Sequence, residues 1–239
     1  MTTNTIMHDP ATLHPSLWLA SQLARAGSEC VDTGFPALSK QLPGGGWPLG
    51  GLVELLLAQP GIGELRLLRP ALQQLASQRI ALLQPPHAPH AAGFAALGIA
   101  PQHLLWLRSK KQGDALWAAQ QILQSASCGA LLFWQSQIKS ESLRRLHLAA
   151  QQSQSLFCLL RPLSVARDAS PAILRLALRP APFGLRIEFI KRRGPLRETP
   201  LFLPLPACLG IVDRHVTLDR IAPAPVSARS VLPALVGVR

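Results

Sequence analysis

Long apolar runs are missing from this chain of 239 residues, and none approaches the roughly 18 residues that a membrane-spanning helix needs. The N-terminal sequence MTTNTIMHDP also lacks the basic segment followed by an apolar segment that is typical of a secretory signal. We therefore expect a cytoplasmic protein with no membrane partner. The hydrophobic fraction of 48% indicates that a chain of this length can bury a substantial core.

Paired cysteines are also missing, because none of the four cysteines has the C-x-x-C spacing of many metal and redox sites. This scatter predicts free, buried thiols and neither disulfides nor a zinc site. His87 and His90 resemble a metal pair only superficially, since Pro89 separates them and the sequence offers no third ligand. We expect no metal site. The four cysteines are Cys30, Cys128, Cys158 and Cys208.

Acidic residues are scarce: 12 Asp and Glu stand against 24 Lys and Arg, which gives a formal charge of +12. Residues 1–160 carry 11 basic and 7 acidic side chains (+4), whereas residues 161–239 carry 13 and 5 (+8). A basic concentration can contact nucleic acid, because neutralising phosphates releases counterions. It can also be a solvated face or reflect an Arg-rich, Lys-poor composition. The candidate DNA contacts are Lys110, Lys111, Lys191, Arg192 and Arg193.

Strand-like and helix-like segments alternate through most of the chain. Short apolar runs predict buried strands, and apolar residues at helical spacing predict helices. Their alternation predicts an α/β fold with a doubly wound, mostly parallel central sheet. The expected strands cover residues 52–57, 79–84, 103–107, 129–134 and 156–160, and the expected helices cover residues 15–26, 65–78, 113–126 and 140–154.

Single residues carry local expectations within these helices. Asp114 and Ser140 are expected to begin their helices as capping residues. Pro70 should fall in a first turn or kink its helix, because proline lacks the N–H that an interior position donates. Trp18 and Trp117 are candidate partner anchors, although Trp117 is expected to pack into the core.

The pattern changes to strict alternation after residue 172. Residues 173–179 and 185–189 each alternate apolar with charged side chains, and APFG lies between them. This predicts a C-terminal antiparallel hairpin with one solvent-facing side that includes Arg175. Repeated prolines from Pro195 onward predict loops, one short strand and a poorly ordered tail. The expected organisation is an N-terminal segment with a short helix (1–29), a core domain (30–195) and a Pro-rich basic extension (196–239).

The stretch from Thr33 to Arg66, TGFPALSKQLPGGGWPLGGLVELLLAQPGIGELR, has the layout of a phosphate-binding unit, with a strand, a Gly-containing turn and a helix. A working P-loop needs G-x-x-x-x-G-K-[ST], in which the Lys neutralises phosphate and the hydroxyl holds Mg²⁺. If Gly63 is the second glycine, the first falls on Ala58, the Lys on Glu64 and the hydroxyl on Leu65. The sequence therefore predicts a degenerate P-loop that binds no nucleotide cofactor.

The string TGFPALSKQLPGGGWPLGGLVEL resembles the segment that leads into the P-loop in the RecA superfamily. It resembles still more closely the ImuA family of translesion-synthesis accessory proteins and the SulA family of division inhibitors, and the similarity extends more weakly over residues 30–195. The resemblance implies a RecA-like core. It also implies that Pro86 stands where RecA has its catalytic glutamate. By the same resemblance, residues 134–136 lack a Mg²⁺-binding aspartate, and residues 160–162 lack a phosphate-sensing glutamine. We therefore expect no catalytic residues and no enzyme activity.

The resemblance to the ImuA family implies an accessory protein of SOS-induced, error-prone translesion DNA synthesis. Its partners would be a Y-family polymerase-like adaptor and an error-prone DnaE-type polymerase, with RecA and single-stranded DNA as further candidates, and it would associate with the nucleoid on DNA damage. The alternative is a SulA-type inhibitor that binds the tubulin-like division protein. The length of the chain and its basic C-terminal part favour the first. An ATPase with an unorthodox site is a third hypothesis.

Overall fold

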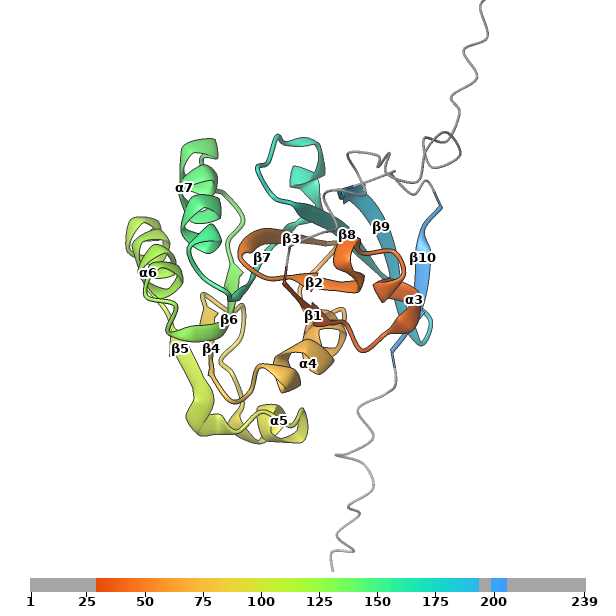
Figure 1. Cartoon of the computed structure of the whole chain (residues 1–239), viewed down its shortest axis with the longest axis horizontal. Helices are drawn as coiled ribbons and strands as arrows, with labels where there is room; N and C mark the ends of the chain where they lie inside the picture. Colours follow the sequence, from red (N-terminus) through yellow and green to blue (C-terminus); the bar gives the residue numbers. More distant parts are fainter. Residues whose placement is uncertain (1–28, 194–198, 206–239) are drawn as a thin grey trace, which may run out of the picture. The chain divides into compact units, whose positions relative to one another are not determined.

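The centre of the fold is an eight-stranded sheet (Figure 1), in a computed structural model that describes residues 29–193 and 199–205. Its strands are β3 (Gly51–Leu57), β4 (Arg79–Leu83), β5 (Leu104–Leu107), β6 (Cys128–Trp134), β7 (Leu156–Pro162), β8 (Leu174–Ala181), β9 (Gly184–Lys191) and β10 (Leu201–Pro204). They are ordered β10-β9-β8-β3-β7-β6-β4-β5. Neighbours from β8 to β5 pair in parallel, whereas β9 is antiparallel to both β8 and β10. The predicted mostly parallel α/β sheet and the antiparallel hairpin are confirmed.

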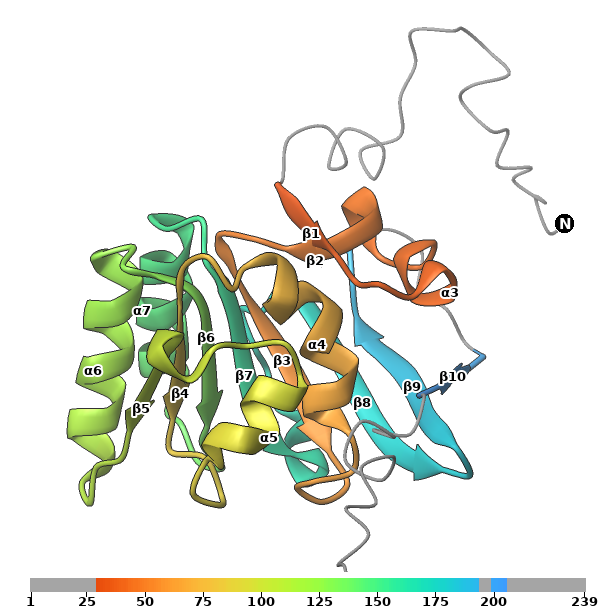
Figure 2. The same cartoon turned by 90° about the horizontal axis from the view of Figure 1, so that it is seen from below.

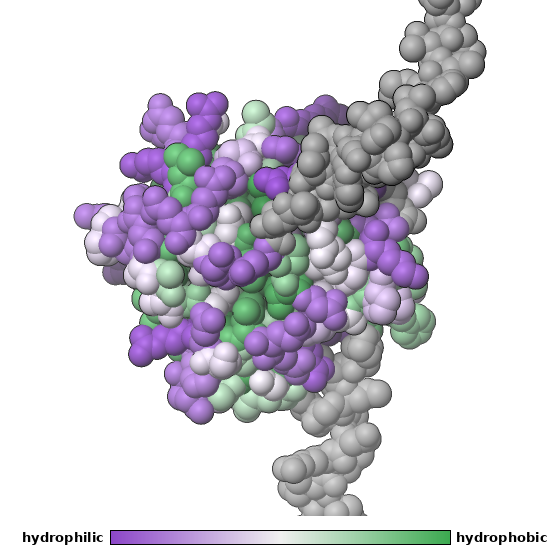
Figure 3. All heavy atoms as spheres, viewed as in Figure 1, coloured by the Kyte–Doolittle hydropathy of each residue, from purple (hydrophilic) through white to green (hydrophobic). Residues whose placement is uncertain are grey.

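Helices cover both faces of the sheet (Figure 2). α4 (Glu64–Gln74) and α5 (Ala91–Ala96) pack on one face, and α6 (Gln112–Gln124) and α7 (Ser140–Gln151) pack on the other. Hydrophilic side chains dominate the outer surface over α6 and α7 (Figure 3). Among the described helices, none combines the length and apolar character needed to cross a membrane.

Smaller elements complete the core on the α4 side. An antiparallel pair, β1 (Cys30–Asp32) and β2 (Gly46–Pro48), packs there together with the short helix α3 (Pro36–Ser39), and the indole of Trp47 is fully buried. Three short 3₁₀ helices join the strands: η1 (Pro43–Gly45), η2 (Pro101–His103) and η3 (Leu163–Arg167).

β3 is buried on both faces, which explains its continuous apolar sequence. Successive side chains of a strand point to opposite faces. Val53 and Leu55 therefore join the cluster that includes α4, whereas Leu52 joins the cluster that includes α6 and α7. β3 lies between β7 and β8 and so occupies the interior of the sheet.

Helix ends differ from the sequence expectations by a few residues. The helix that was expected to reach residue 78 ends at Gln74, and the helix from Ser140 ends at Gln151. Neither Asp114 nor Ser140 is a cap: Lys111 and Lys139 hold those positions without a side-chain capping bond. The carboxylate of Asp114 lies instead in the first turn, where the helix dipole favours negative charge.

Pro70 lies inside α4 and not in its first turn. Its ring is in close contact with Gly34, because a Cβ on that glycine would lie only 2.3 Å from the Pro70 Cβ. The Gln74 side chain donates to the Pro70 carbonyl (3.1 Å) and to the Asp32 carbonyl (3.2 Å), and it thereby links α4 to β1. From within the helix, the Pro70 ring therefore packs against Gly34.

The expectation that Trp117 packs in the core is wrong, since 65% of this residue is exposed. The buried face of α6 is formed by Ala115, Ala119, Ile122 and Leu123, and small alanines let the helix approach the sheet closely. Trp117 is two positions from each alanine, which turns it away from that face. The predicted helix 15–26, with Trp18, and the tail with Cys208 lie outside the described residues.

A buried ionic triad joins three strands at the centre of the sheet. The Glu54 carboxylate on β3 accepts from Arg161 Nη1 on β7 (3.2 Å) and from Arg175 Nε on β8 (2.5 Å). Arg175 also donates to the carbonyls of Val165, Ala166 and Asp168. The expectation that Arg175 faces solvent is therefore wrong, because the helix η3 covers that face of the hairpin and supplies acceptors for the guanidinium.

We expect Glu54→Gln to lower the free energy of unfolding by about 3–5 kcal/mol, because it leaves two buried guanidinium groups without their counter-charge. The matched control is Glu188→Gln, whose carboxylate pairs with the largely exposed Arg179 and Arg186. That control should lose no more than about 1 kcal/mol. Urea unfolding of both variants measures the difference, and equal losses would contradict the central role of Glu54.

Candidate functional site

The loop that follows β3 holds a buried carboxylate at the start of α4. Residues 58–63 connect the carboxyl end of β3 to Glu64, the first residue of the helix. Glu64 is 4% exposed, and its two oxygens accept from the backbone N–H groups of Gly61 (2.8 Å) and Gly63 (3.1 Å). Free N–H groups at a helix N-terminus favour an anion. In this chain, that anion is the protein's own side chain.

The loop conformation depends on its glycines. Gly61 has a φ of 82° and Gly63 a φ of 120°, both in the region that favours glycine. These angles turn the two N–H groups toward the Glu64 carboxylate. Leu65, at the hydroxyl position of the P-loop pattern, is partly buried against the core and contributes no polar atom.

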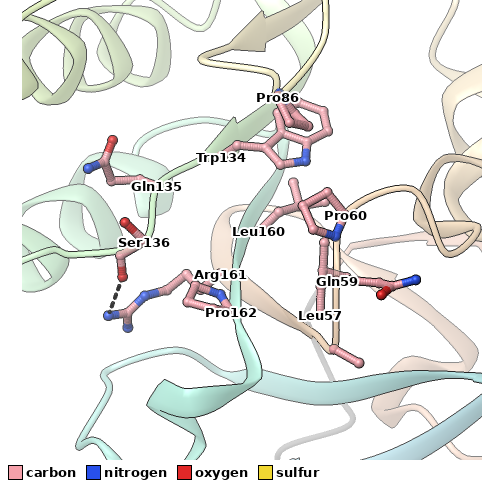
Figure 4. A pocket seen from close by; sticks show the side chains of 11 residues that line it. Leu57, Gln59, Pro60, Pro86, Trp134, Gln135, Ser136, Leu160, Arg161 and Pro162 are labelled. Carbon is pink, nitrogen blue, oxygen red and sulfur yellow. Dashed lines mark hydrogen bonds between the residues drawn. The ribbon is translucent and has the colours of Figure 1, made fainter.

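A pocket of about 350 Å³ lies beside this loop, at the carboxyl ends of β3, β6 and β7 (Figure 4). In an open α/β sheet this edge is the usual place for a ligand. The pocket brings together four segments that are far apart in the sequence. Its lining residues are Leu57, Ala58, Gln59, Pro60, Pro86, Trp134, Gln135, Ser136, Leu160, Arg161 and Pro162.

The positions selected by the RecA resemblance meet in this pocket. Ala58, Pro86, residues 134–136 and residues 160–162 all line it, whereas Gly63 and Glu64 do not. Arg161 is the one charged residue among those that line it, so the pocket wall has no carboxylate for a divalent cation and no lysine. The lining is otherwise apolar or amidic, with a single hydroxyl.

Two nitrogen atoms of the pocket residues are buried without a hydrogen-bond partner: Trp134 Nε1 and Arg161 Nε. Arg161 Nη1 donates to Glu54, and Nη2 donates to the Ser136 carbonyl (3.3 Å). Figure 4 shows this guanidinium reaching toward Ser136 and the indole of Trp134 beside Pro86. Sequence reasoning missed the role of Arg161. Its signal was an arginine at the end of an otherwise apolar buried strand.

The candidate DNA contacts lie at opposite ends of the sheet. Lys110 and Lys111 follow the carboxyl end of β5, at one edge. Lys191 ends β9, which is antiparallel to β8 and therefore finishes at the amino end of the parallel strands. The two groups therefore do not form one continuous basic surface.

Arg192 makes contacts within the fold. It donates to the Gln41 carbonyl (2.6 Å), and its guanidinium carbon lies 5.3 Å from the centroid of the Phe189 ring. Lys191 Nζ donates to the Ser170 carbonyl (2.9 Å) and remains exposed, as does Arg193. Of the three basic residues at this end of the hairpin, Lys191 and Arg193 are the more exposed.

The pKa of His147 on α7 responds to the basic residues at this end of the sheet. Its pKa is lowered by burial first, and then by the charges of Lys191 and Arg193. Its Nδ1 accepts from the Leu52 N–H (3.4 Å), which requires that nitrogen to be unprotonated. Because the pKa in the folded state lies below the unfolded value, the unfolded state takes up the proton first. Stability is therefore lost as pH falls through the ordinary histidine pKa.

The described cysteines are buried or partly buried in the fold, and His90 caps a helix. Cys128 and Cys158 are buried free thiols, as predicted, and burial raises the pKa of both, whereas Cys30 is only partly buried. His90 caps α5, since its Nδ1 accepts from the Gly93 N–H (3.3 Å). In residues 29–193 and 199–205, no group of three or more His, Cys, Asp or Glu is placed to hold a metal ion.

We expect the double substitution Lys191→Gln/Arg193→Gln to raise the pKa of His147, because two repelling charges are removed. Burial is unchanged, so the pKa should stay below the ordinary value of about 6.5. An NMR titration of the His147 ring protons measures it. Lys110→Gln/Lys111→Gln, at the other end of the sheet, is the control and should have no effect. An unchanged pKa in the first variant would show that these charges do not act on His147.

Neither the known protein-family models nor the curated protein sequences contain a match to this chain.

Proposed function

We propose that this chain is a non-catalytic adaptor with a RecA-like core, whose β3–α4 loop is a degenerate P-loop. The observation that carries the proposal is the Glu64 carboxylate on the N–H groups of Gly61 and Gly63. These are the amides that a phosphate would need. A phosphate arriving there must displace the carboxylate and meet its charge, which costs about 4 kcal/mol for unit charges 4 Å apart at an effective dielectric near 20.

The chemistry of the neighbouring pocket also supports a non-catalytic role. General acid–base catalysis needs a group that can accept and return a proton near neutral pH. Pro86, Trp134 and Leu160 cannot, and Arg161 stays charged. Phosphoryl transfer additionally needs Mg²⁺, and the pocket lining presents no carboxylate to bind it.

The resemblance to the ImuA family supplies the proposed cellular role. In that role the chain connects a Y-family polymerase-like adaptor with an error-prone DnaE-type polymerase during SOS-induced translesion synthesis, and it associates with the nucleoid when DNA is damaged. Large exposed apolar residues on the helices, Trp117 and Leu148, provide the kind of side chain that protein interfaces favour. Contact with RecA or with single-stranded DNA would use the two basic groups separately, because they lie at opposite ends of the sheet.

We expect the full chain, tagged and isolated from DNA-damaged cells, to recover the Y-family polymerase-like adaptor and the DnaE-type polymerase. Trp117→Ser should reduce this recovery, and the matched control Phe183→Ser, at the exposed hairpin turn, should not. Mass spectrometry of the recovered proteins measures both. Recovery of the tubulin-like division protein without either polymerase would instead support the SulA-type inhibitor and overturn the translesion role.

We also expect no saturable heat when the full chain is titrated with Mg-ATP at millimolar concentration, because Glu64 occupies the loop amides and Lys and hydroxyl ligands are missing from the loop. An active RecA-type ATPase serves as the positive control in the same calorimeter. Saturable binding in the submillimolar range would overturn the degenerate P-loop and favour an ATPase with an unorthodox site.

A further inference from the structure

In the part of the chain that the structure describes, the antiparallel end of the sheet, β8-β9-β10, is fully covered on one face only. The side chains that point into the core cluster on the α4 side are Leu185, Ile187, Leu201 and Leu203. On the opposite face, α6 and α7 pack against β3, β4, β6 and β7 (Figure 2), and Val165 of η3 packs on Ala177 of β8. Nearer the hairpin turn, side chains of all three strands are exposed on this face.

Three of these exposed side chains form a row across the strands. The register pairs Phe202 on β10 with Arg186 on β9, and it pairs Arg186 with Arg179 on β8. Directly paired residues of neighbouring strands point to the same face, and the strands lie about 4.8 Å apart. Phe202 is 52% exposed, and the side chains of Arg186 and Arg179 are 56% and 46% exposed. The row therefore presents an aromatic ring beside two guanidinium groups.

The two arginines give this row an excess of positive charge. Arg179 Nε and Arg186 Nε pair with the same Glu188 oxygen, at 3.3 Å and 3.5 Å, and no other described carboxylate pairs with either. Like charges directly opposite each other on two strands repel. Exposed ion pairs also contribute little free energy, so the shared carboxylate holds neither guanidinium firmly. A further anion would relieve the repulsion between them.

The chemistry of the row selects single-stranded nucleic acid as its ligand. Guanidinium groups bind phosphates, and an exposed aromatic ring stacks on an unpaired base. Sheet faces that carry aromatic residues bind single strands in this way. We propose that Phe202, Arg186 and Arg179 form a binding surface for single-stranded nucleic acid, with a base on the ring and phosphates on the two arginines. A duplex fits this surface less well, because its bases are already stacked on each other.

This surface is distinct from the two basic groups at the ends of the sheet. Arg186 and Lys191 are both on β9, but the intervening residues place them roughly 16 Å apart along the strand. The inference deepens the proposed function, which includes contact with single-stranded DNA, and it rests on that function for its cellular role. Binding is tested on the purified chain without a polymerase. A failed pull-down and a failed oligonucleotide titration are therefore separate outcomes.

The test is fluorescence anisotropy of the full chain with a labelled oligothymidylate of about 15 nucleotides, a length that single-strand sites can occupy. We expect saturable binding that salt weakens and that is about fivefold tighter than binding to a duplex of the same length. Unlabelled oligothymidylate should displace the probe. Poly-L-glutamate at the same charge concentration should not, because it has no bases. No saturable binding, equal affinity for the duplex, or equal displacement by polyglutamate would overturn the proposal, and the last result would indicate an acidic protein partner.

Variants of the ring test the stacking contact. Phe202→Leu keeps an apolar side chain and removes the ring, so the oligonucleotide should bind about tenfold more weakly. Phe202→Trp should bind at least as tightly as the original chain, because the larger ring also stacks. Thermal unfolding of both variants checks that the fold is retained. Unchanged affinity in Phe202→Leu, or an equal loss in Phe202→Trp, would contradict stacking on this residue.

Variants of the arginines test the phosphate contacts. Arg179→Gln/Arg186→Gln should lower the slope of log affinity against log salt concentration by about 1.4, since each contact to a single-strand phosphate contributes about 0.7. The matched control is Arg144→Gln/Arg145→Gln, which removes two exposed charges from α7 and should leave the slope unchanged. An equal change in both double variants would show that the chain binds by net charge alone and would overturn the assignment to this row.

Discussion

The pairing of Glu54 with two arginines constrains the centre of this fold. A carboxylate on the interior strand β3 can be fully buried only if its charge is met, and β7 and β8 meet it from both sides. This pairing also fixes the order and register of the strands. It sets β3 next to both strands in one register, with Glu54 opposite Leu159 and Arg175, and it requires η3 to cover the second guanidinium. A shift of one residue would turn Glu54 to the other face.

At the carboxyl edge of the sheet, two charged side chains from distant parts of the sequence, Glu64 and Arg161, have contrasting surroundings. At the loop after β3, surplus backbone donors are satisfied internally by Glu64. At the end of β7, Arg161 Nε is buried without a partner, and Arg161 shares the single carboxylate of Glu54 with Arg175. The same edge therefore combines a carboxylate that is satisfied by backbone N–H groups with a guanidinium that shares its counter-charge with a second arginine.

The sequence predicted the regular part of the structure well and the exceptions poorly. Continuous apolar runs identified β3, β6 and β7 because strands buried on both faces leave no polar positions. Arg175 was misplaced because alternation indicates which residues share a face but not whether another segment covers that face. Trp117 was misplaced because alanines, and not the largest apolar side chain, pack α6 against the sheet. For the site, spacing placed Glu64 and Leu65 where a P-loop pattern has a lysine and a hydroxyl. The hydrogen bonds of Glu64 and the open donors of Arg161 and Trp134 depend on distances that no spacing reveals.

The burial of Glu54 has a consequence for the order in which the chain can fold. Its partners lie 107 and 121 residues later in the sequence. During synthesis, β3 therefore leaves the ribosome long before either arginine has been added to the chain. Until then, its apolar side chains lack the neighbouring strands that cover them in the native sheet. Long-range parallel pairing of this kind slows folding and prolongs the exposure of aggregation-prone strands. The innermost strand of the native sheet is thus among the first to be made and among the last to be enclosed.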